Sequence, residues 1–166
     1  MPEALLLRVA TDADSLRIAR FVAAALAEFS LTFEPDGHDA DLRSVAGAYA
    51  GGAFLVVVDA SDQIHGTGGV LPIGPDTMQI RKMYVAPSLR GLGWGRRILG
   101  LLLEEARARP DIRRITLETF HAMTAARALY ERHGFRPVAC QAPGPRCDMS
   151  YVLELGPGPG ARPPRQ

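Results

Sequence analysis

The residues best suited to chemistry form a glycine-rich run past the middle of the chain, from Arg90 to Gly95, and Arg96 and Arg97 follow it directly. Glycine lets the backbone adopt conformations closed to other residues, and it lets a ligand approach closely. Successive backbone N–H groups can then point into one concavity, and a helix beginning there adds the positive end of its dipole. Together with the arginines, this run predicts a site for a phosphate or pyrophosphate group.

Three phosphate-binding patterns can be compared with this run. A Walker A loop requires Gly-Lys-Ser/Thr, but arginines follow Gly95. A Rossmann fingerprint counted from Gly91 would need a glycine where Arg96 stands, and it usually lies near the start of a domain. The third pattern, Arg/Gln-x-x-Gly-x-Gly/Ala, is matched at each fixed position, beginning at Arg90. A glycine-rich turn without a ligand is the alternative to a phosphate site.

The elements around this run place it between a strand and a helix. Residues 78–85 form a predicted strand that Pro87 ends, and residues 94–109 form the most strongly amphipathic helix of the chain. The other predicted elements are strands at 5–9, 53–58, 64–73, 112–120, 135–139 and 149–155 and helices at 14–29, 40–49 and 124–133. The order β-α-α-β-β-β-α-β-α-β-β predicts an α/β (α+β) fold with helices on both faces of a mixed sheet.

The apolar pattern of the strand at 78–85 has one irregularity. Ile80 and Met83 are both apolar although they are an odd number of residues apart, so strict alternation would send them to opposite faces. A bulge between or beside them would return both to one face and leave an N–H group unpaired. A strand buried on both faces explains the pattern equally well.

Length and composition narrow the class of protein. A chain of 166 residues suggests one domain, expected at 1–155, with a Gly/Pro-rich tail at 156–166 expected to be flexible. The net charge of +1 argues against nucleic acid or a membrane as partner, and no apolar run suits a signal peptide or a membrane span. Cys140 and Cys147 are expected to be two ordinary thiols of a cytoplasmic protein, without a metal site.

The glycine-rich run resembles the acetyl-CoA pyrophosphate loop of the Gcn5-related N-acetyltransferase (GNAT) family. Residues 83–87, Met-Tyr-Val-Ala-Pro, are similar to the family's fourth strand as it enters that loop. Residues 128–135, Ala-Leu-Tyr-Glu-Arg-His-Gly-Phe, resemble the family's late helix, and residues 8–14 resemble its first strand and helix entry. The resemblance covers about residues 5–155, and its three patterns occur in the family's order.

The resemblance implies a GNAT fold, with a mostly antiparallel central sheet of about seven strands. It implies an N-acetyltransferase that uses acetyl-CoA as co-substrate and needs no metal. The acceptor would be the primary amine of a small molecule or peptide, attacking directly in a ternary complex, and residues 29–49 would set its identity. A homodimer is compatible with the resemblance. The alternative is a non-catalytic acetyl-CoA-binding sensor or regulatory module, whereas a nucleotide hydrolase would need the missing Lys and Ser/Thr.

The resemblance also assigns the cofactor site. In the family, a bulge in the fourth strand presents backbone amides to the thioester and the pantetheine arm. We therefore place Met83, Tyr84 and Val85 at that bulge. The family often has Asn seven residues before its late tyrosine, but here that position is Met123, and Thr124 is the candidate replacement. The predicted cofactor-binding residues are Met83, Tyr84, Val85, Arg90, Gly91, Leu92, Gly93, Trp94, Gly95, Arg96 and Thr124.

Two side chains are catalytic candidates. Tyr130 stands where many family members carry a tyrosine that bonds the CoA sulfur, so its phenol could protonate the leaving thiolate; packing of an aromatic ring is the alternative role. Glu118, on the strand beside the cofactor strand, could take the proton of the amine through water, or it could pair with Arg81 or Lys82. The groups interpreted as solvated surface groups near the substrate loop are Glu28, Glu34 and His38.

Overall fold

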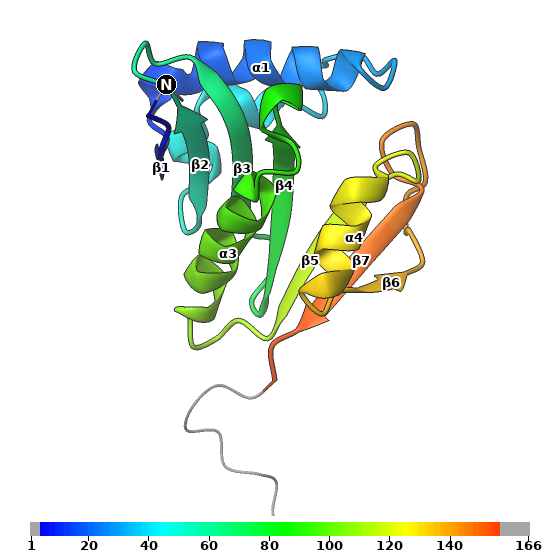
Figure 1. Cartoon of the computed structure of the whole chain (residues 1–166). Helices are drawn as coiled ribbons and strands as arrows, with labels where there is room; N and C mark the ends of the chain where they lie inside the picture. Colours follow the sequence, from blue (N-terminus) through cyan, green and yellow to red (C-terminus); the bar gives the residue numbers. More distant parts are fainter. Residues whose placement is uncertain (1–3, 157–166) are drawn as a thin grey trace, which may run out of the picture.

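The computed structural model describes residues 4–156, so all but the first residue of the predicted tail lies outside the described part (Figure 1). Over these residues the chain forms one seven-stranded sheet in the order β1-β2-β3-β4-β5-β7-β6. Neighbouring strands are antiparallel except for β4 and β5, which run parallel. The strands are β1 Leu6–Val9, β2 Ala53–Val58, β3 Ile64–Pro72, β4 Thr77–Val85, β5 Arg114–Thr119, β6 Arg136–Val138 and β7 Met149–Glu154.

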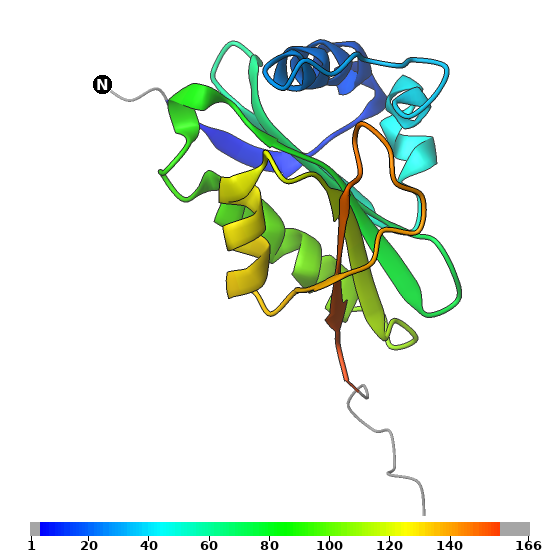
Figure 2. The same cartoon turned by 90° about the vertical axis from the view of Figure 1, so that its right-hand side faces the viewer.

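Helices cover both faces of this sheet (Figure 2). The α-helices are α1 Ser15–Ala27, α2 Val45–Ala48, α3 Trp94–Arg107 and α4 Thr124–Arg132, and the short 3₁₀ helices are η1 Asp12–Asp14, η2 Ala40–Arg43 and η3 Pro87–Leu89. One core cluster joins α3 and α4 to one face of the sheet, and a second joins α1, η2 and α2 to the other face. The predicted fold class and element order are therefore confirmed.

The segment predicted as one helix over residues 40–49 is instead two short pieces. Ser44 has extended backbone angles, with φ −144° and ψ 94°, and it separates η2 from α2. Its hydroxyl accepts a hydrogen bond from the N–H of Gly47 (3.3 Å) and donates to the carboxylate of Asp12 (3.0 Å). The prediction of one helix was wrong because a serine side chain can cap a new helix instead of continuing the old one.

The irregularity in β4 is a bulge, as one of the two sequence interpretations predicted. Thr67 pairs with Tyr84 and Gly69 pairs with Arg81, so β4 contains one more residue than β3 over this stretch. Ile80 and Met83 both pack in the core cluster under α3, although three positions separate them. The extra residue therefore resets the alternation, and it does so where β4 approaches the glycine-rich loop.

The two cysteines are joined in a disulfide, Cys140–Cys147, with their Cα atoms 6.8 Å apart. The prediction of two ordinary thiols was therefore wrong. It rested on the expected compartment, whereas pairing depends on geometry, and the β6–β7 connection folds back on itself at the isolated bridge between Gly144 and Cys147. None of the helices in residues 4–156 has the length and apolar character that crossing a membrane requires.

This disulfide should stabilise the fold measurably. For a closed loop this short, chain entropy predicts a contribution of about 2 kcal/mol, so the variant Cys140→Ser should lower the melting temperature by roughly 5 °C. Dithiothreitol should lower the melting temperature of the wild type by a similar amount and should leave that of Cys140→Ser unchanged. A wild type whose melting temperature is the same with and without dithiothreitol would contradict this prediction.

Candidate active site

A cavity lies where β4 and β5 separate. The two strands pair only from Thr77–Arg114 to Ile80–Leu117, and beyond these pairs each continues without the other. The bulge of β4, the end of β5, α4 and the β6–β7 loop surround the gap. The cavity has a volume of about 60 Å³, enough for a few heavy atoms, and is lined by Ile80, Arg81, Lys82, Met83, Tyr84, Leu117, Glu118, Thr119, Phe120, Met123, Tyr130 and Arg146.

The split between the strands leaves the backbone of β4 open on one side. Arg81, Tyr84 and Val85 pair with β3 on one edge, whereas residues 81–85 have no partner in β5 on the other edge. In a strand, N–H and C=O groups alternate between the two edges, so some of the backbone groups of this stretch face the cavity. Part of the backbone of residues 83–85 is therefore open to a ligand on the side away from β3, and the predicted role of these residues in cofactor binding stays a prediction.

The glycine-rich loop connects β4 to α3 in the conformation its sequence predicts. Gly91 and Gly93 have φ values of +76° and +84°, which favour glycine, and a Cβ at either position would meet no atom of residues 4–156 within 4 Å. In the described part of the chain, no acceptor bonds the N–H groups of residues 93–96; the first bond of the helix runs from Arg97 to Gly93 (3.1 Å). Unpaired N–H groups at a helix start, beside glycines whose Cβ positions are open, fit an anionic group such as pyrophosphate.

The arginines of this loop have different surroundings. Arg90 forms an ion pair with Glu28 at the end of α1 (2.7 Å) and donates a hydrogen bond to the carbonyl of Val85 (3.2 Å). Arg97 lies over the indole ring of Trp94, 4.1 Å from its centroid, and this ring packs against the core under α3. Arg90 thus ties the loop to α1, a connection that the sequence pattern did not predict, and Trp94 helps to anchor the loop.

Tyr130 lies on α4 with its ring in the core and lines the cavity. Its ring meets those of Phe135 and Tyr151, with centroids 5.9 Å and 6.1 Å away. Burial, with the nearby Tyr84, raises the pKa of Tyr130, so the phenol keeps its proton at neutral pH. Among the bonds within residues 4–156, the Tyr151 hydroxyl donates to Glu131 (2.8 Å), whereas the Tyr130 hydroxyl has no partner. Tyr130 thus packs as an aromatic residue and keeps a donor available at the cavity.

Glu118 is exposed where β5 borders the cavity. The ion pairs considered from the sequence do not form, because Arg81 donates to Gln79 (2.6 Å) and Lys82 pairs with Asp39 (2.6 Å). Glu118 therefore has its carboxylate free of both cations. Its role as a base stays a prediction.

The start of α4 does not support the prediction that Thr124 replaces the family's Asn. Met123, just before this helix, lines the cavity, whereas Thr124 is the exposed first residue of α4 and is not part of the lining. The structure thus gives Met123 the position next to the cavity and brings no support for a contact through Thr124.

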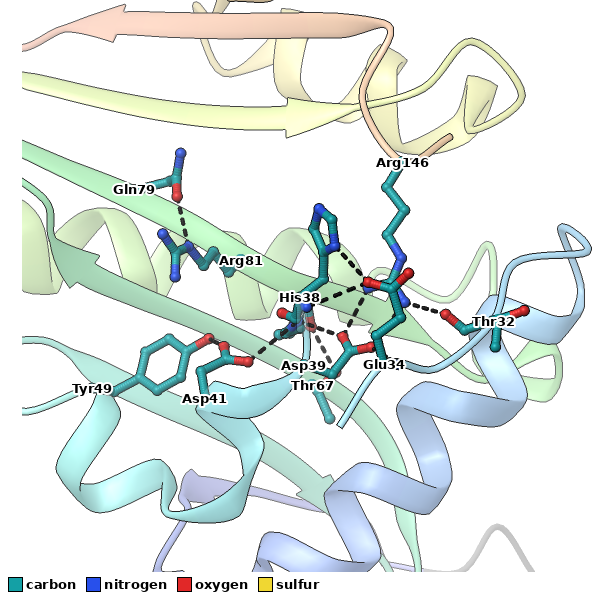
Figure 3. A network of polar contacts seen from close by, with 11 residues as sticks. Thr32, Glu34, His38, Asp39, Asp41, Tyr49, Thr67, Gln79, Arg81 and Arg146 are labelled. Atoms are coloured by element: carbon teal, nitrogen blue, oxygen red, sulfur yellow. Dashed lines mark hydrogen bonds and ion pairs between the residues drawn. The ribbon is translucent and has the colours of Figure 1, made fainter. Parts of the chain in front are cut away.

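A buried ion-pair network beside the cavity, which includes the lining residues Lys82 and Arg146, was missed by sequence reasoning (Figure 3). Asp39, whose side chain is fully buried, accepts hydrogen bonds from Lys82 (2.6 Å), from both terminal nitrogens of Arg146 (2.9 and 2.8 Å) and from the N–H of Glu34 (2.7 Å). Burial alone would raise the pKa of Asp39, but these bonds outweigh it and lower that pKa to about 2. Because 107 residues separate Asp39 from Arg146, no local pattern could have predicted their pairing.

Two further residues complete this network. Asp41 approaches the Lys82 ammonium (3.4 Å) and accepts a hydrogen bond from the hydroxyl of Tyr49. Burial, with Asp41 beside it, raises the pKa of Tyr49, which therefore stays a neutral donor. Residues 4–156 contain no group of three or more His, Cys, Asp or Glu side chains that could hold a metal ion.

The network should make stability depend on pH in the acid range. A carboxyl group whose pKa is lowered by folding contributes stability above its unfolded value, near 3.8, and loses it as the pH falls toward about 2. For Asp39 this contribution is about 2 kcal/mol. We therefore expect Asp39→Asn to be less stable than the wild type at pH 6, with a difference that shrinks as the pH falls from 5 to 3. Urea unfolding across this range would measure it, and a difference independent of pH would contradict the assignment.

Comparisons with known proteins identify the family of this chain. The sequence model of the acetyltransferase (GNAT) family matches residues 19–135. An uncharacterized N-acetyltransferase of Escherichia coli (strain K12), YjgM, is 31% identical over 144 residues, which cover 82% of this chain and 85% of that protein. The chain therefore belongs to the GNAT family and is an acetyltransferase, which confirms the resemblance found in its sequence.

Solved structures of the family share the fold. An acetyltransferase of the GNAT family from Staphylococcus aureus MU50 superposes with a TM-score of 0.79 at 21% identity, covering 92% of this chain and 99% of that one. A phosphinothricin acetyltransferase from Sinorhizobium meliloti, solved in complex with AcCoA, superposes with a TM-score of 0.71 at 19% identity, covering 96% of this chain and 93% of that one. At such identities these likenesses concern the fold alone.

Proposed function

We propose that this acetyltransferase transfers an acetyl group from acetyl-CoA to the primary amine of a small molecule or peptide, by direct attack within a ternary complex. One observation carries the proposal. The cavity at the split between β4 and β5 brings together an open strand edge, the neutral phenol of Tyr130 and the carboxylate of Glu118. The glycine-rich loop continues from the same strand, β4.

The cofactor would lie along β4. Its pyrophosphate would accept hydrogen bonds from the unpaired N–H groups at the start of α3, as the open loop there allows. Its pantetheine arm would follow the unpaired edge of β4 to the bulge, where backbone amides of residues 83–85 would face the thioester carbonyl. A donor at that carbonyl stabilises the negative charge that develops there during attack.

Two side chains, Glu118 and Tyr130, would then transfer the two protons of the reaction. The neutral amine attacks the thioester carbon, a C–N bond forms and the C–S bond breaks. Glu118, exposed at the cavity, would take the proton of the amine through water. Tyr130, which is neutral and has no hydrogen-bond partner among residues 4–156, would give its proton to the departing sulfur. Holding both reactants in one cavity supplies much of the remaining acceleration.

A screen against a panel of amines tests this proposal. The panel would contain amino acids, polyamines, aminoglycosides and peptides with free N-termini, and mass spectrometry would detect acetylated products at the expense of acetyl-CoA. We expect at least one class of amine to be acetylated faster than in the absence of protein. Tight acetyl-CoA binding without acetylation of any amine would overturn the proposal and favour the acetyl-CoA sensor.

A further inference from the structure

Lys82 occupies the bulge in a backbone conformation that a lysine rarely adopts. Its φ of +56° lies in the left-handed region, which is sterically unfavourable for a residue with a Cβ. Asn, Asp and Gly are the residues that adopt this conformation most readily. The surrounding structure must therefore hold Lys82 there.

Two contacts hold this residue, one at each end. At its backbone, the hydroxyl of the fully buried Thr67 on β3 donates to the Lys82 carbonyl (2.7 Å). At its side chain, which is only 8% exposed, the ammonium donates to Asp39 (2.6 Å) and to the carbonyl of His38 (2.8 Å). Glycine or asparagine could adopt the φ value, but neither could reach the carboxylate of Asp39.

Asp39 connects the bulge to two other parts of the site. Its carboxylate also binds Arg146, a cavity-lining residue of the β6–β7 loop, and the N–H of Glu34, in the segment between α1 and η2. Figure 3 shows these groups converging from separate segments. Since a buried ion pair often stabilises a fold no better than an apolar contact, stability alone is a weak reason for this cluster. Its position beside the exposed strand edge suggests a role in the reaction.

We propose that Asp39 and Lys82 are positioning residues for acyl transfer, which clamp the β4 bulge so that those backbone amides of residues 83–85 that face away from β3 are held toward the cavity. The same clamp fixes Arg146 against the acceptor side. This inference rests on the proposed function, because it assumes that those amides face the thioester. Neither residue needs to touch the reacting atoms.

The chain offers a matched control for a purely structural ion pair. Asp14, at the start of α1, is as buried as Asp39, each with 1% of its surface exposed. It binds Arg8 (2.8 and 2.9 Å), Arg17 (2.6 Å) and the N–H of Thr11 (2.9 Å). None of these residues lines the cavity. Asp14→Asn should thus destabilise the fold without moving the bulge.

The test compares Asp39→Asn, Lys82→Met and Asp14→Asn at a temperature where each is folded. Hydrogen exchange by mass spectrometry would follow the peptide that contains residues 82–85. In Asp39→Asn and Lys82→Met we expect its exchange to be at least about tenfold faster, because the open state of the bulge would be more populated. In Asp14→Asn the exchange of the peptide with residues 82–85 should change no more than the exchange of peptides from the rest of the sheet.

Kinetic measurements distinguish a positioning role of Asp39 and Lys82 from a purely structural one. We expect kcat to fall about tenfold or more in Asp39→Asn and Lys82→Met, because a misplaced donor loses its effect in the transition state. The Kd for acetyl-CoA should stay within about threefold of the wild type, since the loop before α3 is untouched. Asp14→Asn should keep kcat near the wild-type value. If Asp39→Asn does not fold, Thr67→Val tests the backbone contact and should change exchange and kcat in the same direction.

Two kinds of result would overturn the positioning role of Asp39 and Lys82. Variants of Asp39 and Lys82 that match Asp14→Asn in both exchange and kcat would overturn the proposal, as would Lys82→Gly with full activity, because glycine keeps the φ value without the clamp. A wild type that acetylates no amine would instead overturn the proposed function and, with it, the role in acyl transfer. The exchange data would then still show whether the two residues hold the bulge.

Discussion

Gly93→Asp should weaken the binding of acetyl-CoA by more than tenfold, a loss of at least about 1.4 kcal/mol. Gly93 has a φ of +84° and directly precedes α3, and open space lies where a Cβ would be. An aspartate there would direct a negative charge toward the helix start, where the unpaired N–H groups favour an anion. Isothermal titration calorimetry would measure the affinity, and circular dichroism would confirm folding.

Two control variants separate charge from conformation. Gly93→Asn has nearly the same shape as Gly93→Asp and a similar tolerance of positive φ, but no charge. It should therefore bind acetyl-CoA more tightly than Gly93→Asp. Gly100→Asp places the same charge further along α3, where a Cβ would also meet no atom within 4 Å, and it should bind almost normally. Unchanged affinity in a folded Gly93→Asp would remove the loop from the cofactor site.

Tyr130→Phe should lower kcat by about tenfold to a hundredfold, near the low end of what general acid catalysis supplies, while the affinity for acetyl-CoA stays close to wild type. The change keeps the ring that packs near Phe135 and Tyr151 and removes only the hydroxyl at the cavity. We expect the low end because a thiol with a pKa of about 8.5 leaves readily as a thiolate and water can substitute for the phenol. The measurement needs saturating substrates and an acceptor found in the amine screen.

Tyr151→Phe is the matched control for the hydroxyl. Tyr151 is fully buried beside Tyr130, but its hydroxyl is bonded to Glu131 (2.8 Å) and it does not line the cavity. Its loss should cost about 1 kcal/mol of stability and leave kcat unchanged. Equal kcat values in Tyr130→Phe and wild type, with chemistry shown to limit the rate, would end the case for Tyr130 as the acid.

Local patterns predicted the elements around the cofactor loop. Alternating glycines followed by an amphipathic run predicted a loop that enters a helix at Trp94, and α3 begins there. The spacing of Ile80 and Met83 predicted a bulge or a doubly buried strand, and the resemblance favoured the bulge that the structure contains. The loop, the helix start and the bulge depend on residues within a few positions of one another, so they can be predicted from the sequence alone.

The ion pairs beside the cavity could not be predicted in the same way. The pairing of Asp39 with Arg146 and the contact of Arg90 with Glu28 each join segments that only the folded sheet brings together. Charged residues in a sequence are by default expected at the surface, so nothing local marked Asp39 as buried. The free carboxylate of Glu118 likewise depends on Lys82 having a partner on a distant segment.

By itself, the sequence determined the order of strands and helices, the conformation of the glycine-rich loop and the position of Tyr130 on a late helix, because backbone preference and hydrophobic periodicity act over one or two turns. The separation of β4 from β5, the cavity between them and the buried ion pairs beside it were decided by the packed sheet. Burial and desolvation determine the protonation states and the contacts of these side chains. They arise only when segments far apart in the chain come into contact.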